Sequence, residues 1–287
     1  MTAAVRQRNS EIASPGEYLF TWKDFSEIAG LLYAMSGIHM VEAKASLMYS
    51  RLAKRVRTLK LPDFAAYCEL VRDESQVEER SAMLSALTTN VTRFYREPHH
   101  FDHLRSTVMP RLAETARAGG RVRLWSAGCS AGHEPYSMAM TVLETLPEAA
   151  RLDVRILASD IDPQIVARAA AGIYSDDDVD PIPPAVRSRH VRRVEGGWKV
   201  SDEAQGLITF RTLNLLGDWP MRGRFDVIFC RNVAIYFDDQ TQNRLFERFS
   251  EQLHDGAQLY IGHSERAMNP NLNPEGLTGY RRESRRG

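Results

Sequence analysis

The sequence predicts an α/β fold with an all-helical domain in front of it. After Gly119 and Gly120, short apolar runs end in polar turns and are mostly followed by helical stretches, which is the pattern of a parallel sheet covered by helices. Between residues 22 and 87 the apolar residues recur instead at helical spacing. A length of 287 residues, 43% of them hydrophobic and 26% charged, is enough for two globular domains.

The helical domain is expected at residues 19–87, as three or four short helices. Thr21 is placed to cap the first helix, whose inner face would carry Phe25 and Ile28. Residues 1–18 lack periodicity and include a Ser-Pro-Gly run, which predicts a flexible leader in front of the fold.

A linker with a bridging helix is expected at residues 88–118. Helical spacing resumes at Pro98, which can occupy the first turn of a helix. Pro110 should kink this helix, because proline has no N–H to donate and its ring clashes with the preceding turn.

The sheet domain is expected at residues 119–287. Its five strands are predicted at residues 122–126, 154–159, 207–212, 225–230 and 258–261. Residues from about 175 to 206 break the rhythm with clustered Asp and Pro residues and a Gly-Gly turn between two short apolar runs. This pattern predicts a small hairpin inserted into the sheet domain.

Charge and cysteine content exclude several classes of protein. The chain has 37 basic and 37 acidic residues, so no overall field attracts it to nucleic acid or to an anionic membrane. Three cysteines, Cys68, Cys129 and Cys230, are an odd number spread along the chain, which argues against a disulfide framework or a structural zinc site. We expect a reduced, cytoplasmic protein with neither a signal peptide nor a membrane span, because the sequence has no apolar run of either kind.

The charges segregate inside the helical domain. Residues 41–60 carry six basic residues and one acid, a local charge of +5, and residues 63–79 carry six acids and one arginine, a local charge of −5. Helical spacing aligns Lys44, Arg51 and Arg55 into a basic ridge on one face. The ridge is either a solvated surface paired with the neighbouring acids or a docking surface for an acidic partner. Nucleic acid is the less favoured partner, since no aromatic residues interleave with these charges.

Polar and small residues follow the first two predicted strands. The stretch WSAGCSAGHEPYSMAM, residues 125–140, contains a turn of Ala and Gly residues that lets the backbone approach a cofactor or, equally, packs strand tightly against helix. The second strand ends at Asp160, where a carboxylate can hold a ribose diol, with a helix cap as the competing interpretation. Together they favour nucleoside binding. The sequence has no GxGxxG and no Walker lysine, which disfavours a phosphate cofactor.

The fourth predicted strand opens into a polar segment that contains Arg231, Asn232 and Tyr236. Polar groups that leave the carboxyl end of a central parallel strand face the ligand crevice. A lone tyrosine at this point is usually a core aromatic residue. Tyr236 follows Arg231 and Asn232 in the same segment, which favours a role in the site.

Six motifs in this chain resemble those of CheR-type chemotaxis receptor methyltransferases and occur in the same order. They are LTTNVTRFYREPHHF (residues 87–101), WSAGCSAGHEPYSMAM, ASDID (158–162), NLL (214–216), FDVIFCRNVAIYF (225–237) and GHSE (262–265). The resemblance covers about residues 20–265. It implies a Rossmann-like domain for S-adenosylmethionine (SAM) with a small antiparallel β-subdomain inserted, preceded by the helical domain. It further implies signal transduction in bacterial chemotaxis, through methyl transfer to glutamate side chains of chemoreceptors, with S-adenosylhomocysteine as the product.

The resemblance also assigns site residues. Those that match cofactor-binding positions are Asn90, Thr92, Arg96, Glu134, Asp160, Asn214, Leu215, Arg231 and Asn232. Arg96 and Tyr236 match the residues nearest the transferred methyl group and are the expected catalytic pair. No metal is expected, and His99 and His100 are interpreted as surface or cap residues. A glutamate carboxylate is already ionised at neutral pH, so the reaction needs positioning and desolvation and no general base.

The chain departs from the family pattern in places. Ala131 and His133 stand in the glycine turn where Thr and Glu are expected, and the segment after Glu265 is brief. The turn at residues 195–198 is shorter than in members that dock a receptor C-terminal pentapeptide. We therefore expect a monomer that reaches chemoreceptors through its helical domain and without that tether. Two alternatives stay open: a SAM methyltransferase for another protein or a small molecule, and a SAM-binding module without catalytic activity.

Overall fold

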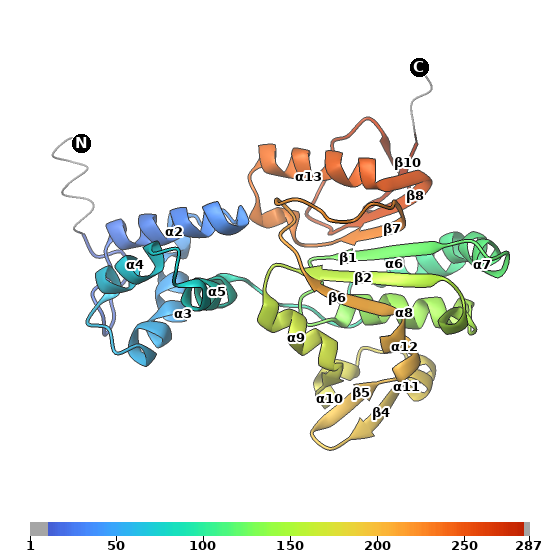
Figure 1. Cartoon of the computed structure of the whole chain (residues 1–287), viewed down its shortest axis with the longest axis horizontal. Helices are drawn as coiled ribbons and strands as arrows, with labels where there is room; N and C mark the ends of the chain where they lie inside the picture. The colour runs from blue at the N-terminus through green and yellow to red at the C-terminus, as the bar shows by residue number, and fades with distance from the viewer. Residues whose placement is uncertain (1–10, 284–287) are drawn as a thin grey trace. The chain divides into compact units, whose positions relative to one another are not determined.

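The computed structural model describes residues 11–283, and the chain divides after Thr89 into two compact units (Figure 1). The first unit is helical, and the second contains a seven-stranded sheet and a separate three-stranded sheet. The α/β class with an all-helical part in front of it is therefore confirmed. Within residues 11–283, none of the helices has both the length and the apolar run that crossing a membrane requires.

The helical unit is built from short amphipathic helices with strong local start signals. They are α2 (Trp22–Ser36), η1 (Glu42–Lys44), α3 (Ala45–Thr58), α4 (Phe64–Arg72) and α5 (Val77–Leu87). Thr21 and Asp24 form a capping box at the start of α2, and the Asp63 side chain caps α4. The inner stripes of α2, α3 and α4 are fully buried and hold the unit together, as at Ile28, Leu52 and Phe64.

The described part of the expected leader, residues 11–18, contacts the helical unit. Ile12 forms an antiparallel bridge with Thr21. Ser14 is buried, and the N–H of Tyr18 donates to the hydroxyl of Tyr49 over 3.2 Å. The prediction of a flexible leader is therefore wrong for residues 11–18, and residues 1–10 lie outside the described part of the chain.

Two of the three predicted ridge residues serve the helical unit itself. Arg51 donates to the carbonyl oxygens of Leu87 and Thr88 at 2.9 and 3.0 Å. Arg55 forms an ion pair with Glu79, whose carboxylate is 7% exposed and also accepts from the hydroxyl of Tyr67 at 2.9 Å. These contacts tie α3 to α5. Arg51 and Arg55 are half-buried and bonded within the unit, so pairing with a neighbouring acid is confirmed for Arg55, whereas Lys44 is exposed. Docking of a partner by the ridge stays a prediction.

The second unit begins with a long helical segment that changes its winding before a proline. It consists of α6 (Pro98–His103), a π-helical turn η2 (Leu104–Val108) and α7 (Met109–Arg117). Pro110 cannot donate to the carbonyl of Ser106, and its ring would clash with that group. The wider π turn lies at this point of the helix. The structure thus shows a change of helical winding just before Pro110, and a kink of the helix axis there stays a prediction.

All five predicted strands are confirmed. They are β1 (Val122–Ala127), β2 (Val154–Asp160), β6 (Ile208–Thr212), β7 (Phe225–Cys230) and β8 (Leu253–Ile261). The sheet order is β6-β2-β1-β7-β8-β10-β9, and the first five strands are parallel. Two further strands, β9 (Leu272–Pro274) and β10 (Gly279–Arg282), were not predicted from the sequence. β10 pairs antiparallel with β8, and β9 pairs antiparallel with β10.

Helices cover both faces of this sheet (Figure 1). Leu124 of β1 packs with α8 (His133–Thr145) and the α6–α7 segment, whereas its neighbour Trp125 packs with α13 (Asp239–Gln252). Successive side chains of a strand point to opposite faces. The near-continuous apolar sequence of β1 therefore reflects burial on both sides.

The predicted insertion is confirmed as a three-stranded antiparallel sheet of order β3-β5-β4. Its strands are β3 (Ile173–Tyr174), β4 (Val191–Val194) and β5 (Gly197–Val200), and it also carries α10 (Asp176–Val179), α11 (Pro184–His190) and α12 (Asp202–Gly206). It leaves the main sheet domain after α9 (Pro163–Ala171). A Cβ on Gly197 would lie 2.3 Å from the carbonyl oxygen of Tyr174, so this close strand pairing requires glycine.

Candidate active site

The predicted site residues lie mainly where parallel strands end. The register aligns Ala127 with Ser159 and Asp160 with Thr212, and it places the end of β7 beside the end of β8. The carboxyl ends of β1, β2, β6 and β7 therefore share one edge of the sheet. Ligands of open parallel sheets bind at this edge.

The turn after β1 folds tightly over the end of β2. The N–H groups of Gly128 and Cys129 both donate to the carbonyl oxygen of Ser159 at 2.8 Å. Gly128 and Gly132 have φ values of 86° and 89°, and a Cβ on either would lie within 3 Å of a neighbouring side chain. The close packing that one interpretation of this small-residue turn predicts is confirmed, and approach of its backbone to a cofactor stays a prediction.

Asp160 is held at the centre of this edge. Its Oδ2 accepts from the N–H of Ser130 at 2.8 Å and its Oδ1 accepts from the N–H of Asp162 at 3.1 Å. Burial raises the pKa of its carboxyl group, although these N–H groups favour the ionised form. The competing interpretation of Asp160 as the cap of α9 is wrong, because the side chain of Asp162 caps that helix by accepting from the N–H of Gln164.

The segment that contains Asn90, Thr92 and Arg96 approaches the turn after β1. Ser130 Oγ lies 3.3 Å from the carbonyl oxygen of Asn90. Thr92 is half-buried. The guanidinium of Arg96 donates to the carbonyl of Val91 at 3.0 Å, so this side chain folds back onto its own segment. Convergence of the Arg96 and Tyr236 side chains on one carboxylate stays a prediction.

A buried charge network joins β1, α8 and β7. Glu134 accepts from the hydroxyl of Ser126 at 2.8 Å and from the guanidinium of Arg231 at 3.2 Å. Arg231 is 6% exposed, also pairs with Glu97 at 3.3 Å, and donates to the main-chain carbonyl of Arg96. Burial raises the pKa of Glu134, and Arg231 opposes that rise. Arg231 thus stabilises two carboxylates and ties the segment of Arg96 to β7.

Glu97 and His263 are members of this network that the sequence analysis did not single out. His263 Nδ1 lies 2.9 Å from Glu97 Oε1. Burial alone would raise the pKa of Glu97, but the hydrogen bond from His263 and the charge of Arg231 hold it at about 2. Glu97 lies in the motif at residues 87–101 and His263 in the motif at residues 262–265. The sequence alone does not indicate that they are in contact, because they are 166 residues apart.

His100 is buried, so its interpretation as a surface or cap residue is wrong. It is 1% exposed, and its Nε2 donates to the carbonyl oxygen of Leu277 at 3.1 Å. Burial and the neighbouring Arg231 lower its pKa to about 3, so the ring is neutral at physiological pH. His99 is half-buried.

Asn214 and Leu215 follow β6 beside Asp160. The N–H of Leu213 donates to the carbonyl of Asp160 at 2.8 Å, and Asn214 Oδ1 accepts from the N–H of Leu216 at 3.0 Å. Leu215 is buried in the same apolar cluster as Trp125. The main-chain bond between Leu213 and Asp160 places the segment that carries Asn214 and Leu215 directly after the paired ends of β6 and β2.

Asn232 and Tyr236 lie in the turn after β7. Asn232 has a φ of 59°, a left-handed conformation that is uncommon for residues other than glycine. Tyr236 ends the short helix η4 (Ala234–Tyr236) and is half-buried. Its ring is therefore neither fully in the core nor fully in solvent.

The two departures in the glycine turn have structural roles. His133 is 3% exposed, its Nε2 lies 3.3 Å from Asp178 Oδ1, and its ring packs against Phe94 and Tyr174. Burial lowers its pKa. The carbonyl oxygen of Ala131 accepts from the hydroxyl of Tyr174 at 2.8 Å. Both residues therefore join the turn to the inserted sheet.

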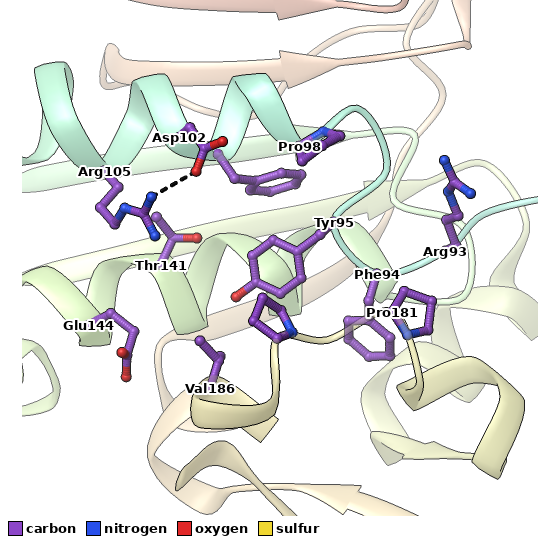
Figure 2. A pocket seen from close by; sticks show the side chains of 12 residues that line it. Arg93, Phe94, Tyr95, Pro98, Asp102, Arg105, Thr141, Glu144, Pro181 and Val186 are labelled. Carbon is purple, nitrogen blue, oxygen red and sulfur yellow. Dashed lines mark hydrogen bonds and ion pairs between the residues drawn. The ribbon is translucent and has the colours of Figure 1, made fainter. Parts of the chain in front are cut away.

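A cavity of about 330 Å³ lies apart from the strand ends, between α6, α8 and the insertion (Figure 2). Its walls include Tyr95, Pro98, Thr141 and Val186. Of the predicted site residues, none lines it. Tyr95 belongs to the same segment as Asn90 and Arg96, and its side chain lines this cavity together with Thr141 of α8. This places that part of the segment beside α8.

The strand-end site fits a nucleoside cofactor such as SAM. It contains a buried carboxylate at Asp160, a turn after β1 in which glycines allow close approach, and a polar amide with an apolar neighbour at Asn214 and Leu215. The fold is thus that of a parallel α/β domain with a candidate nucleoside site at its strand ends.

Both units match models of one family. Residues 90–277 match the SAM binding domain of CheR methyltransferase, and residues 23–88 match its all-alpha domain. A probable chemotaxis protein methyltransferase of Rhizobium etli is 51% identical over 240 residues, which cover 82% of this chain and 90% of the relative. The chemotaxis protein methyltransferase of Escherichia coli is 39% identical over 247 residues, 84% of this chain and 83% of its own. PKMT2 of Rickettsia typhi, solved with AdoHcy, covers 55% of this chain and 25% of its own at 14% identity with a TM-score of 0.33, a likeness too low to carry an argument.

The protein is therefore a SAM-dependent methyltransferase. The chain belongs to the CheR methyltransferase family, with both of that family's domains present.

Proposed function

We propose that this enzyme methylates glutamate side chains of chemoreceptors, as a monomer in the bacterial cytoplasm and without a metal. Membership of a family whose relatives are named chemotaxis protein methyltransferases supports the receptor class. The observation that carries the choice of nucleophile is the turn after β7, where the half-buried Tyr236 follows the end of a central parallel strand. A phenolic hydroxyl can donate a hydrogen bond to an incoming carboxylate.

The residues divide into three tasks. Asp160 accepts from the ribose hydroxyls, Asn214 and Leu215 contact the adenine, and Asn90 and Thr92 close over the cofactor. Glu134, Arg231 and Asn232 lie toward its methionine end. When bound, SAM supplies an activated sulfonium methyl group.

Arg96 and Tyr236 hold the substrate carboxylate in line with that methyl group and exclude water from it. No proton has to be moved, because glutamate has a reference pKa of about 4.3. The rate then depends on alignment and on the desolvation of two opposite charges.

Transfer of a labelled methyl group to a chemoreceptor cytoplasmic fragment tests the proposal. Glutamate methyl esters hydrolyse in alkali, so the label should be released as volatile methanol. Label that resists alkali would indicate N-methylation and favour another substrate. Tight SAM binding without transfer to any candidate receptor would favour a module without catalytic activity.

We also propose that the helical domain docks the receptor through the basic ridge of Lys44, Arg51 and Arg55, of which Lys44 is the most exposed. Arg51 and Arg55 are engaged within the unit, so exchanging all three residues would damage the fold as well as the surface. Lys44→Glu should lower receptor methylation severalfold at low salt and leave SAM affinity unchanged, with Lys44→Gln intermediate, because surface charges mainly change association rates. Equal methylation rates for the three proteins at low salt would remove Lys44 from the docking surface.

The final proposal is that the chain does not bind a receptor C-terminal pentapeptide. Only Glu195 and Gly196 separate β4 from β5, which supports the short turn noted in the sequence. A labelled pentapeptide titrated with the enzyme should show no saturable change in fluorescence anisotropy, and a receptor that lacks its C-terminus should be methylated at the full rate. A saturable complex with the pentapeptide contradicts this expectation.

A further inference from the structure

The glutamate of the GHSE motif, Glu265, hydrogen-bonds the main chain of the turn after β7. The carboxylate of Glu265 accepts from the N–H groups of Asn232 and Val233, both at 2.9 Å, and from that of Ile235 at 3.3 Å. Glu265 is 7% exposed. A single buried carboxylate thus fixes three main-chain donors of one turn.

The bonds to Glu265 also fix an uncommon backbone conformation. Asn232 has a positive φ of 59°, in the left-handed region that few residues other than glycine adopt, although asparagine is among those that tolerate it. The loop of Glu265 reaches it because Cys230 at the end of β7 is in register with Ile261 at the end of β8. A Cβ on Gly262 would lie 2.4 Å from Asn232 Nδ2, so the first residue of the motif must be glycine for this approach.

The same loop contacts the other side of the site. His263 binds Glu97, and Glu97 pairs with Arg231, the first residue of the turn. The motif is therefore linked both to the turn that carries Tyr236 and to the segment that carries Arg96.

We propose that Glu265 is a positioning residue for methyl transfer: its carboxylate fixes the turn after β7 so that the Tyr236 hydroxyl meets the substrate carboxylate. This inference rests on the proposed role of Tyr236. Glu265 itself touches neither reactant. Its effect should appear as a loss of alignment, which can cost about 10²-fold in rate for small displacements.

Glu265→Gln preserves the shape of the side chain but turns an NH₂ group toward main-chain N–H donors. We expect kcat in single-turnover methylation to fall by about 10- to 100-fold in the folded enzyme. The combined variant with Tyr236→Phe should be little slower than Glu265→Gln alone, since a misplaced hydroxyl contributes nothing further. Glu275→Gln is the matched control: Glu275 accepts from Gln258 at the antiparallel edge of the sheet and should leave kcat unchanged.

If Glu265→Gln does not fold, Gly262→Ala disturbs the same approach through Asn232 and should give the same loss of kcat and the same non-additivity with Tyr236→Phe. A folded Glu265→Gln enzyme with wild-type kcat overturns the proposal. The proposal is also overturned if the double variant loses rate by the product of the losses of Glu265→Gln and Tyr236→Phe, because the two residues would then act independently. The two proposals fail through different variants. A wild-type rate for Tyr236→Phe overturns the proposed role of Tyr236. A wild-type rate for Glu265→Gln overturns the proposed positioning role of Glu265.

Discussion

Tyr236→Phe should slow methyl transfer by about 10²-fold, as expected for a lost hydrogen bond that forms in the transition state. The phenylalanine keeps the ring, which is half-buried at the end of η4, and keeps the main-chain bond from its N–H to the carbonyl of Val233 at 3.2 Å. Only the hydroxyl is removed. SAM affinity should therefore stay within a few-fold of wild type, because the cofactor contacts lie elsewhere in the site.

Single-turnover methylation with enzyme in excess over receptor measures this effect without interference from product release. Tyr280→Phe provides a matched control, since the Tyr280 hydroxyl accepts from the N–H of Ala267 in the same domain and serves the fold. That control should lose some stability and keep its rate. A wild-type rate for Tyr236→Phe would return Tyr236 to a packing role.

Asp160→Ala should weaken SAM binding by about 1.5–3 kcal/mol, the usual range for a charged hydrogen-bonding group, or about 10- to 150-fold in Kd. The Asp160 carboxylate accepts from the N–H groups of Ser130 and Asp162, and a carboxylate has about four acceptor positions, so it can also accept from a ribose hydroxyl. Burial at the strand ends strengthens these bonds relative to water. The affinity should fall far more than kcat at saturating SAM.

Calorimetric titration with S-adenosylhomocysteine isolates this binding step from the chemistry. Asp153→Ala is the matched control, because Asp153 precedes the opposite end of the same strand and pairs with Arg123 at the surface. Its affinity should equal that of wild type. An Asp160→Ala protein that is folded and binds with unchanged Kd would exclude Asp160 from the cofactor site.

The local parts of the fold could be predicted from sequence because they depend on neighbouring residues. The five parallel strands, the capped start of α2 and the inserted hairpin all follow from spacing, cap residues and a Gly-Gly turn. The position of Asp160 at a strand end follows from the same reasoning, because a parallel sheet collects such ends at one edge.

The missed features depend on contacts between distant positions. Arg55 of α3 is paired with Glu79 of α5. Helical periodicity shows which face of α3 carries Arg55 but not which residue of another helix lies opposite that face. Glu265 acts on Asn232 through the register of β7 and β8, which only the folded sheet defines. Strands β9 and β10 are short and partly polar, so they lack the alternating pattern that identifies longer strands.

The most direct measurement for the account as a whole is the location of the transferred methyl group. Wild-type enzyme and SAM are incubated with a chemoreceptor cytoplasmic fragment, and the digested fragment is analysed by mass spectrometry before and after mild alkali. The account predicts the added mass of one methylene on glutamate side chains, its loss in alkali, and only trace modification with Tyr236→Phe. Methyl groups on nitrogen that survive alkali, or on glutamates at equal rates with both enzymes, would contradict it.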